Sequence, residues 1–209
     1  MKLKLGISIL LIALTSVFRT YAQQAAVKTN LVGAALLNVN LGVELSLTHQ
    51  WTFEVPASLN KWILDNTERN DGKRWKHWFV QPGARYWFCG RYDGHFIGVH
   101  IHGGQYNLAG FKGKVSFPGW DGDGNYTGTD FRNIGDTRYH GWFAGGGISY
   151  GYAWILDRHW NIEAEIGLGY AYSRYDKFRC AGCGQMVEHN RPHHYAGPTK
   201  AAINLVYLF

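Results

Sequence analysis

The sequence has no long apolar run beyond its N-terminal segment, and it has little net charge. After residue 22, no uninterrupted apolar stretch reaches the roughly 20 residues that a membrane-spanning helix needs. This excludes a protein built from several transmembrane helices. The formal net charge of +6 falls to +3 when Lys2, Lys4 and Arg19 are removed with the N-terminal segment. So small a positive bias does not indicate nucleic-acid binding.

The N-terminal segment has the layout of an export signal. Lys2 and Lys4 precede an apolar run over residues 5–17, and Thr20-Tyr21-Ala22 offers small residues at a cleavage position. We therefore expect residues 1–22 to be a cleaved secretory signal peptide. A retained membrane anchor is the alternative, although the run is shorter than a spanning helix. Residues 23–209 then have the length of one domain.

The rest of the chain is rich in glycine and aromatic residues, with Gly 27, Tyr 13, Phe 11 and Trp 9. Such enrichment without helical spans favours a closed barrel with a lipid-facing exterior and a narrow interior. Period-2 alternation of apolar and polar residues marks the strands. It predicts eight of them, over 27–36, 40–49, 51–59, 77–88, 95–108, 142–156, 160–176 and 200–209.

The predicted strand 160–176 shows which face meets which environment. From Trp160 to Tyr172 the aliphatic and aromatic residues share one face, whereas Glu163 and Glu165 lie on the other. Aromatic residues near both strand ends suit the two girdles of a membrane barrel. A lipocalin-like barrel or a secreted sandwich is the alternative, but its outward face would be polar. We therefore predict an all-β fold, an eight-stranded antiparallel transmembrane β-barrel.

The connections alternate between short and long. The second, fourth and sixth links are short, whereas those at 60–76, 109–141 and 177–199 are long. Outer-membrane barrels show this asymmetry, with short periplasmic turns and long extracellular loops. The sequence thus predicts an outer-membrane protein of a Gram-negative bacterium with both termini in the periplasm. The short first link, around residues 37–39, departs from the pattern.

The last predicted strand ends on aromatic residues. Residues 200–209 alternate, which places Tyr207 and Phe209 on one face of the strand. A terminal strand of this kind resembles the signal by which outer-membrane barrels are recognised for insertion. We expect Tyr207 and Phe209 to carry that signal.

The inward face of the predicted barrel carries charge. Because side chains just fill an eight-stranded barrel, we expect a packed network of ion pairs and hydrogen bonds there, since shielded charges must be paired. Glu163 and Glu165 as a general acid and base, and a water-filled pore, are the alternatives. The expected network consists of Lys28, Glu44, Glu54, Arg85, His100, His102, Glu163 and Glu165, with Asn30, Gln81 and Asn204 on the same face.

Two loops carry motifs that suggest metal ions. Cys180 and Cys183 form a C-x-x-C pair with His189, His193 and His194 downstream, which is a zinc-like spacing. In an oxidising compartment a Cys180–Cys183 disulfide, or two free thiols, competes with zinc; the sequence leaves these open and favours the disulfide. The run 121–125 begins like a calcium loop but lacks the later glycine and glutamate, which favours a plain turn.

The loop from Lys61 to His77 combines basic residues with tryptophans. Lys73, Arg74 and Lys76 lie beside Trp75 and Trp78. At the outer rim of a barrel these side chains suit the phosphates and sugars of lipopolysaccharide. The alternative is an ordinary solvated loop that ends in an aromatic girdle.

Several short strings in the chain are distinctive. They are 76–82 (KHWFVQP), 85–89 (RYWFC), 94–96 (GHF), 102–107 (HGGQYN), 151–156 (GYAWIL), 175–180 (YDKFRC) and 197–201 (GPTKA). These strings resemble a Bacteroidales family of small outer-membrane proteins defined by a domain of unknown function. The resemblance covers nearly all of the mature chain and implies a small outer-membrane barrel, often encoded near fimbrial or surface-assembly genes. It implies no catalytic residue.

We therefore expect a non-enzymatic scaffold or accessory subunit of a cell-surface assembly, without a cofactor, that meets a protein partner through its outer loops. The first alternative is a lipid A-modifying enzyme similar to the outer-membrane deacylases and acyltransferases. His140, Ser173 and Glu188 would be its candidates, although no spacing ties them together. A narrow channel is the second alternative.

Overall fold

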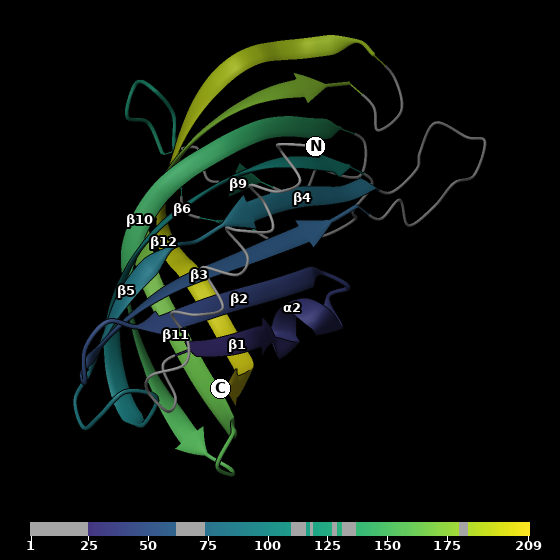
Figure 1. The fold of residues 1–209 in the computed structure, drawn as a ribbon. Coiled ribbons are helices and arrows are strands. Elements are labelled where there is room, and N and C mark those ends of the chain that lie inside the picture. Colours follow the sequence, from purple (N-terminus) through teal and green to yellow (C-terminus); the bar gives the residue numbers. More distant parts are fainter. Residues whose placement is uncertain are drawn as a thin grey trace, which may run out of the picture.

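The computed structural model describes residues 25–61, 74–109, 116–117, 119–126, 129–130, 137–179 and 184–209 (Figure 1). The predicted signal peptide lies outside these residues. No helix among them is long and apolar enough to cross a membrane. The elements are β1 (Ala25–Asn30), α2 (Leu31–Ala35), β2 (Val39–Ser46), β3 (Trp51–Asn60), β4 (Arg74–Val80), β5 (Gly83–Trp87), β6 (Gly94–Ala109), β7 (Ser116–Phe117), β8 (Gly119–Trp120), β9 (Thr129–Asp130), β10 (Arg138–Ile155), β11 (Trp160–Phe178) and β12 (Met186–Leu208).

The strands form one antiparallel ring. The order is β1-β2-β3, then β4 and β5, then β6-β10-β11-β12, and β12 pairs back with β1. β4 and β5 are two parts of one strand, because both lie between β3 and β6. The break falls at Gln81 and Pro82, where proline has no backbone N–H to donate to a ladder. The predicted all-β class with eight antiparallel strands is confirmed.

The first predicted strand, 27–36, is wrong in its second half. β1 ends at Asn30, and the helical turn α2 follows. The Asn30 side-chain oxygen accepts the backbone N–H groups of Val32 and Gly33, which is the geometry of a helix N-cap. The apolar run over 31–36 matches a strand pattern, but the cap at Asn30 decides for a helix.

The predicted long loop at 177–199 is also wrong. β11 extends to Phe178 and β12 begins at Met186, so most of that range is strand. The range carries polar residues on both faces, and therefore shows no alternation of polarity along the chain. Backbone pairing with β11 orders it instead, for example between Pro192 and Arg174.

The strands on one side of the ring are therefore much longer than those on the other. β10, β11 and β12 have 18, 19 and 23 residues, whereas β1 and β2 have 6 and 8. Figure 1 shows β10 to β12 arching beyond the ends of β1 to β3. The turns at the other end are short and joined by backbone hydrogen bonds, among them Arg91 N–H to His49 O and Leu208 N–H to His159 O.

The two faces of the sheet have opposite polarity. Aliphatic and aromatic side chains such as Ile148, Ile166 and Leu168 are exposed on the outside. The buried side chains are mostly polar or charged, and they point into the ring. They are Lys28, Glu44, Thr52, Glu54, Ser58, Asn60, Gln81, Arg85, His100, His102, Ser149, Asn161, Glu163, Glu165, Ser173, Lys200 and Asn204.

Candidate functional site

A network of ion pairs fills the middle of the ring. Lys28 on β1 and Lys200 on β12 face Glu54 on β3, and the Lys28 Nζ lies 2.8 Å from that carboxylate. Lys28 also pairs with Glu44 on β2 and Lys200 with Glu165 on β11. Strand alternation explains why all five side chains point inward. Register places Glu44 directly across from Glu54, where like charges repel unless cations lie between them.

Arg85 is the centre of this network. Its guanidinium contacts Glu44 at 3.2 Å, Glu54 at 2.8 Å and Glu163 at 3.0 Å, and it also pairs with Glu165. An arginine suits this position because its planar fork can donate to several carboxylates at once. The side chain is 1% exposed, so solvent does not replace any of these contacts.

An apolar cluster fills the ring between Arg85 and the short turns. The Arg85 guanidinium lies 4.5 Å from the centre of the Phe96 ring. Phe96 packs on Trp87 with 4.6 Å between ring centres, and Tyr92 contacts Trp87 from the turn between β5 and β6. The Trp87 indole donates to the Thr52 hydroxyl, so its polar atom is satisfied. The end of the ring near the short turns is therefore packed with aromatic side chains.

The two predicted network histidines lie outside the ion pairs. His100 shares a hydrogen bond of 3.0 Å with the Thr199 hydroxyl, and its ring lies 5.7 Å from that of His102. The structure thus brings together six of the eight expected residues and leaves both histidines in a neighbouring layer. It adds Lys200, which the sequence prediction omitted. Lys200 has the same strand parity as Asn204, so alternation was sufficient to place it inward.

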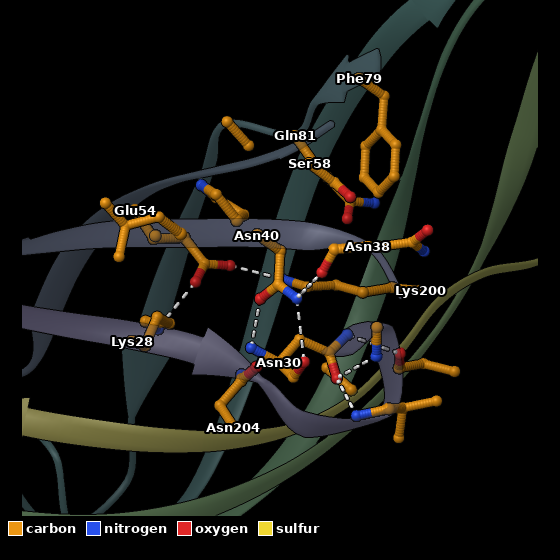
Figure 2. Close-up of a pocket in the computed structure, with 18 of the residues that line it drawn as sticks. Lys28, Asn30, Asn38, Asn40, Glu54, Ser58, Phe79, Gln81, Lys200 and Asn204 are labelled. Carbon is orange, nitrogen blue, oxygen red and sulfur yellow. Dashed lines mark hydrogen bonds and ion pairs between the residues drawn. The ribbon is translucent and has the colours of Figure 1, made fainter. Parts of the chain in front are cut away.

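A cavity of about 220 Å³ lies beside the network, where β1 ends. Figure 2 shows Asn30, Asn40, Ser58 and Lys200 around it. Its lining residues come from β1, α2, β2, β3, β4 and β12 and from the short segments beside them. Its lining comprises Lys28, Asn30, Val32, Gly33, Leu36, Asn38, Asn40, Leu41, Gly42, Glu54, Pro56, Ala57, Ser58, Phe79, Gln81, Thr199, Lys200, Ala201, Ala202 and Asn204.

Asn30 joins three elements at the rim of this cavity. Besides capping α2, its side chain donates to the Ala201 carbonyl and accepts the Ile203 N–H on β12. Asn40 on β2 completes the link, because its side chain accepts the Asn30 N–H and donates to the Asn30 carbonyl. These bonds cover backbone groups at the point where β1 stops pairing with β12.

The expected metal site has no counterpart in the described residues. Cys180 and Cys183 lie outside them, so zinc, disulfide and free thiols remain predictions. His189 pairs with Asp176 at 2.9 Å, and His194 bonds the Tyr170 hydroxyl. In the part of the chain that the structure describes, no three histidine, cysteine or carboxylate side chains are grouped to hold a metal ion.

The acidic run at 121–125 forms a turn. The Asp121 carboxylate accepts the backbone N–H groups of Asn125 at 2.8 Å and Asp123 at 3.0 Å. These bonds, the one from Asn125 foremost, lower the pKa of Asp121 below its ordinary value, because they stabilise the charged form. The carboxylate is thus engaged with its own backbone, as in an Asx-type turn.

The residues considered for lipid chemistry do not meet. The Ser173 hydroxyl lies 2.9 Å from the Tyr106 hydroxyl inside the ring. His140 is exposed, and Glu188 pairs with Lys177 and Arg191 near the end of the β11–β12 hairpin. A hydroxyl nucleophile needs a base within hydrogen-bond reach, and these three side chains do not form such a pair.

The expected lipopolysaccharide loop lies mostly outside the described residues. Its described end has aromatic contacts, with the Trp75 and His77 rings 5.7 Å apart. The Trp78 indole donates to Gln105 on β6. Trp78 is exposed on the outer wall.

The expected insertion residues lie at the end of β12, the strand that pairs with β1 and closes the ring. Tyr207 packs edge-on against Trp160 at 5.0 Å and against Phe209 at 5.1 Å. The Phe209 backbone N–H donates to the Ala25 carbonyl, and its side chain is exposed. Their role in insertion stays a prediction.

The chain is thus an all-β protein whose strands form a ring with a charged interior and an apolar exterior. Residues 7–209 match a family described as proteins of unknown function, DUF3575, and the chain is a member of that family. No curated protein matches the chain.

Proposed function

We propose that this protein is a small β-barrel of the Gram-negative outer membrane that acts without catalysis, as a scaffold or accessory subunit of a cell-surface assembly. The observation that carries the proposal is the inverted polarity of the ring. Ile101, Ile148 and Ile166 are exposed on the outside of three neighbouring strands, whereas the carboxylates and cations are buried inside. An apolar exterior is unfavourable in water but favourable against lipid. The charges inside tolerate burial because they are paired with one another.

The dimensions of the ring support the same conclusion. β3 has 10 residues, and a membrane-spanning strand needs about 9–11. Aromatic side chains gather near both ends of the strands, which suits girdles at two interfaces. Near the short turns these include Trp51, Tyr86 and Trp160; towards the other end they include Trp78 and Trp142.

The packed interior favours binding over transport. The ion-pair network around Arg85 and the aromatic cluster around Trp87 occupy the interior in two successive layers. An eight-stranded ring is just wide enough for its own side chains. A protein of this kind acts through its surface, and the surface beyond the membrane is large here because β10, β11 and β12 are long.

The proposed orientation places both termini and the short turns in the periplasm. The extended strands and the segments 60–76 and 109–141 then face the exterior and form the interaction surface. The predicted loop 177–199 contributes as the tip of the β11–β12 hairpin. Lipopolysaccharide is a proposed second partner, through Trp75, Trp78 and the basic residues beside them.

The proposal is tested by affinity purification from native membranes in mild detergent. Replacing 110–136 or 62–73 by a short Gly-Ser linker is expected to remove the co-purifying surface partner. Heat-modifiable migration on gels is expected to persist, because the ring does not need these segments. Asp157→Ala, in a short turn at the other end, is the control. A partner retained by both shortened variants would contradict the proposed interaction surface.

A further inference from the structure

Two polar side chains in the cavity beside α2 have no partner. Asn204 and Ser58 are 5% and 8% exposed, and both line the cavity. Neither side chain hydrogen-bonds another group within the part of the chain that the structure describes. Their polar atoms are not sealed off, because neither is among the described buried atoms that lack a partner. A serine hydroxyl and an asparagine amide therefore face one accessible space and are free to hydrogen-bond a group that enters it.

The charges at the floor of the cavity select against an ionic ligand. Lys28 and Lys200 both reach Glu54, so their ammonium groups are already paired. An anionic ligand would have to compete with that carboxylate, and a cationic one would face two ammonium groups. A neutral group meets neither penalty.

The two unpartnered side chains favour hydroxyl groups. An asparagine side chain offers donors and an acceptor, a serine offers a hydroxyl, and a hydroxyl group on a ligand can both donate and accept. Asn30, Asn40 and Gln81 border the same space, but their amides are already bonded to protein groups. The volume of about 220 Å³ is smaller than the roughly 300–1,000 Å³ of sites for drug-sized ligands. It suits one small head group.

The rim of the cavity is apolar. β1 stops at Asn30, whereas β2 and β12 continue past it, and α2 lies in the space between them. Leu36, which follows α2, and Leu41 of β2 line the cavity and are exposed. An apolar rim around a polar pocket is complementary to an amphiphile, whose chain would lie against these leucines while its head enters the ring.

We propose that this cavity binds a neutral, hydroxyl-rich head group, such as a sugar ring, carried by a membrane amphiphile whose chain lies over α2 and Leu41. The amphiphilic source rests on the proposed membrane location. The preference for a neutral hydroxyl-rich group rests on the lining alone.

The test uses the folded chain in dodecylphosphocholine micelles with ¹⁵N-labelled asparagine. Dodecyl maltoside is titrated in, and the Asn204 side-chain amide signal, identified by its loss in Asn204→Leu, is followed by NMR. We expect a saturable shift, and an apparent affinity about tenfold weaker in Ser58→Ala, as expected for one lost hydrogen bond. Ser149→Ala is the matched control, because Ser149 on β10 is similarly buried but is not among the residues that line the cavity.

Soluble maltose forms the second arm and separates the two sources of the head group. A shift with dodecyl maltoside alone supports the amphiphile. A shift with both sugars retains the hydroxyl-rich ligand and overturns its lipid source. No saturable shift with either, or an equal effect of Ser58→Ala and Ser149→Ala, overturns the site. Because binding is measured on folded protein in micelles, failure here leaves the partner experiment on native membranes unaffected.

Discussion

At the scale of single residues, Arg85 has the largest electrostatic role. It is the one cation that contacts Glu44, Glu54, Glu163 and Glu165 together within the described residues. Three buried cations face four buried carboxylates in this network, counting Lys28 and Lys200. Without Arg85, only two lysines would remain to neutralise four buried carboxylates, and solvent could not reach them to replace the guanidinium.

Arg85→Met is expected to lower the free energy of unfolding by about 3–5 kcal/mol, the usual cost of leaving buried charges without their partner. Urea unfolding of the micelle-bound protein measures it. Arg191→Met is the control, because Arg191 is exposed and its ion pair with Glu188, at 3.4 Å, is at the surface. Its effect on the free energy of unfolding should stay within about 0.5 kcal/mol. Adding Glu165→Gln to Arg85→Met should recover part of the loss. Equal effects of the two arginine variants would show that the network does not hold the ring together.

At the scale of elements, the contact of β10 with β6 and β11 depends on glycine. A Cβ at Gly151 would lie 2.3 Å from Cζ of Phe96 and 2.6 Å from the Ala164 carbonyl oxygen. The aromatic cluster that closes the ring therefore reaches β10 only because position 151 has no side chain. The carbonyl is backbone and cannot move aside without shifting β11.

Gly151→Ala is expected to destabilise the protein by about 1–3 kcal/mol, the typical cost of overpacking. The measurement is again urea unfolding, with near-ultraviolet circular dichroism to report on the Trp87 environment. Gly184→Ala is the matched control, because a Cβ at Gly184 meets no atom within 4 Å. A Gly151→Ala variant as stable as this control would contradict the close packing of Phe96 against β10.

At the scale of the whole molecule, the inverted polarity distinguishes membrane from water. Ile148 is 67% exposed on β10 and Val187 is 56% exposed near the start of β12. In a water-soluble protein, a surface substitution at either position would have a small effect. In the proposed barrel, Ile148 lies within the apolar belt and Val187 lies beyond it.

Ile148→Arg is therefore expected to destabilise the inserted protein by about 2–4 kcal/mol, and Val187→Arg by about 0–1 kcal/mol. Unfolding in lipid vesicles and the yield of membrane-inserted protein measure the difference. Equal and small effects of the two arginines would contradict the proposed membrane location.

The alternation of side chains along the sequence was enough to predict the ring of eight antiparallel strands and the inward position of Lys28, Glu44, Glu54, Arg85, Glu163 and Glu165. The reason is that strand parity is a local property, which needs no knowledge of neighbours. Lys200 has the same parity as Asn204, so its inward position could have been predicted in the same way. Alternation failed where local polarity is uninformative, as in the first part of β12, and where a side-chain cap overrides the pattern, as at Asn30.

Which inward residues touch was decided only by the tertiary structure. Register and strand length bring Arg85 to four carboxylates but leave His100 and His102 in another layer, and neither quantity can be read from one strand alone. The same holds for the cavity: it exists because β1 stops while β2 and β12 continue, a difference in length between neighbours. The amino-acid sequence by itself determined the two faces of the sheet, since polarity alternates locally. The contacts across the ring depended on how the strands are staggered when it closes.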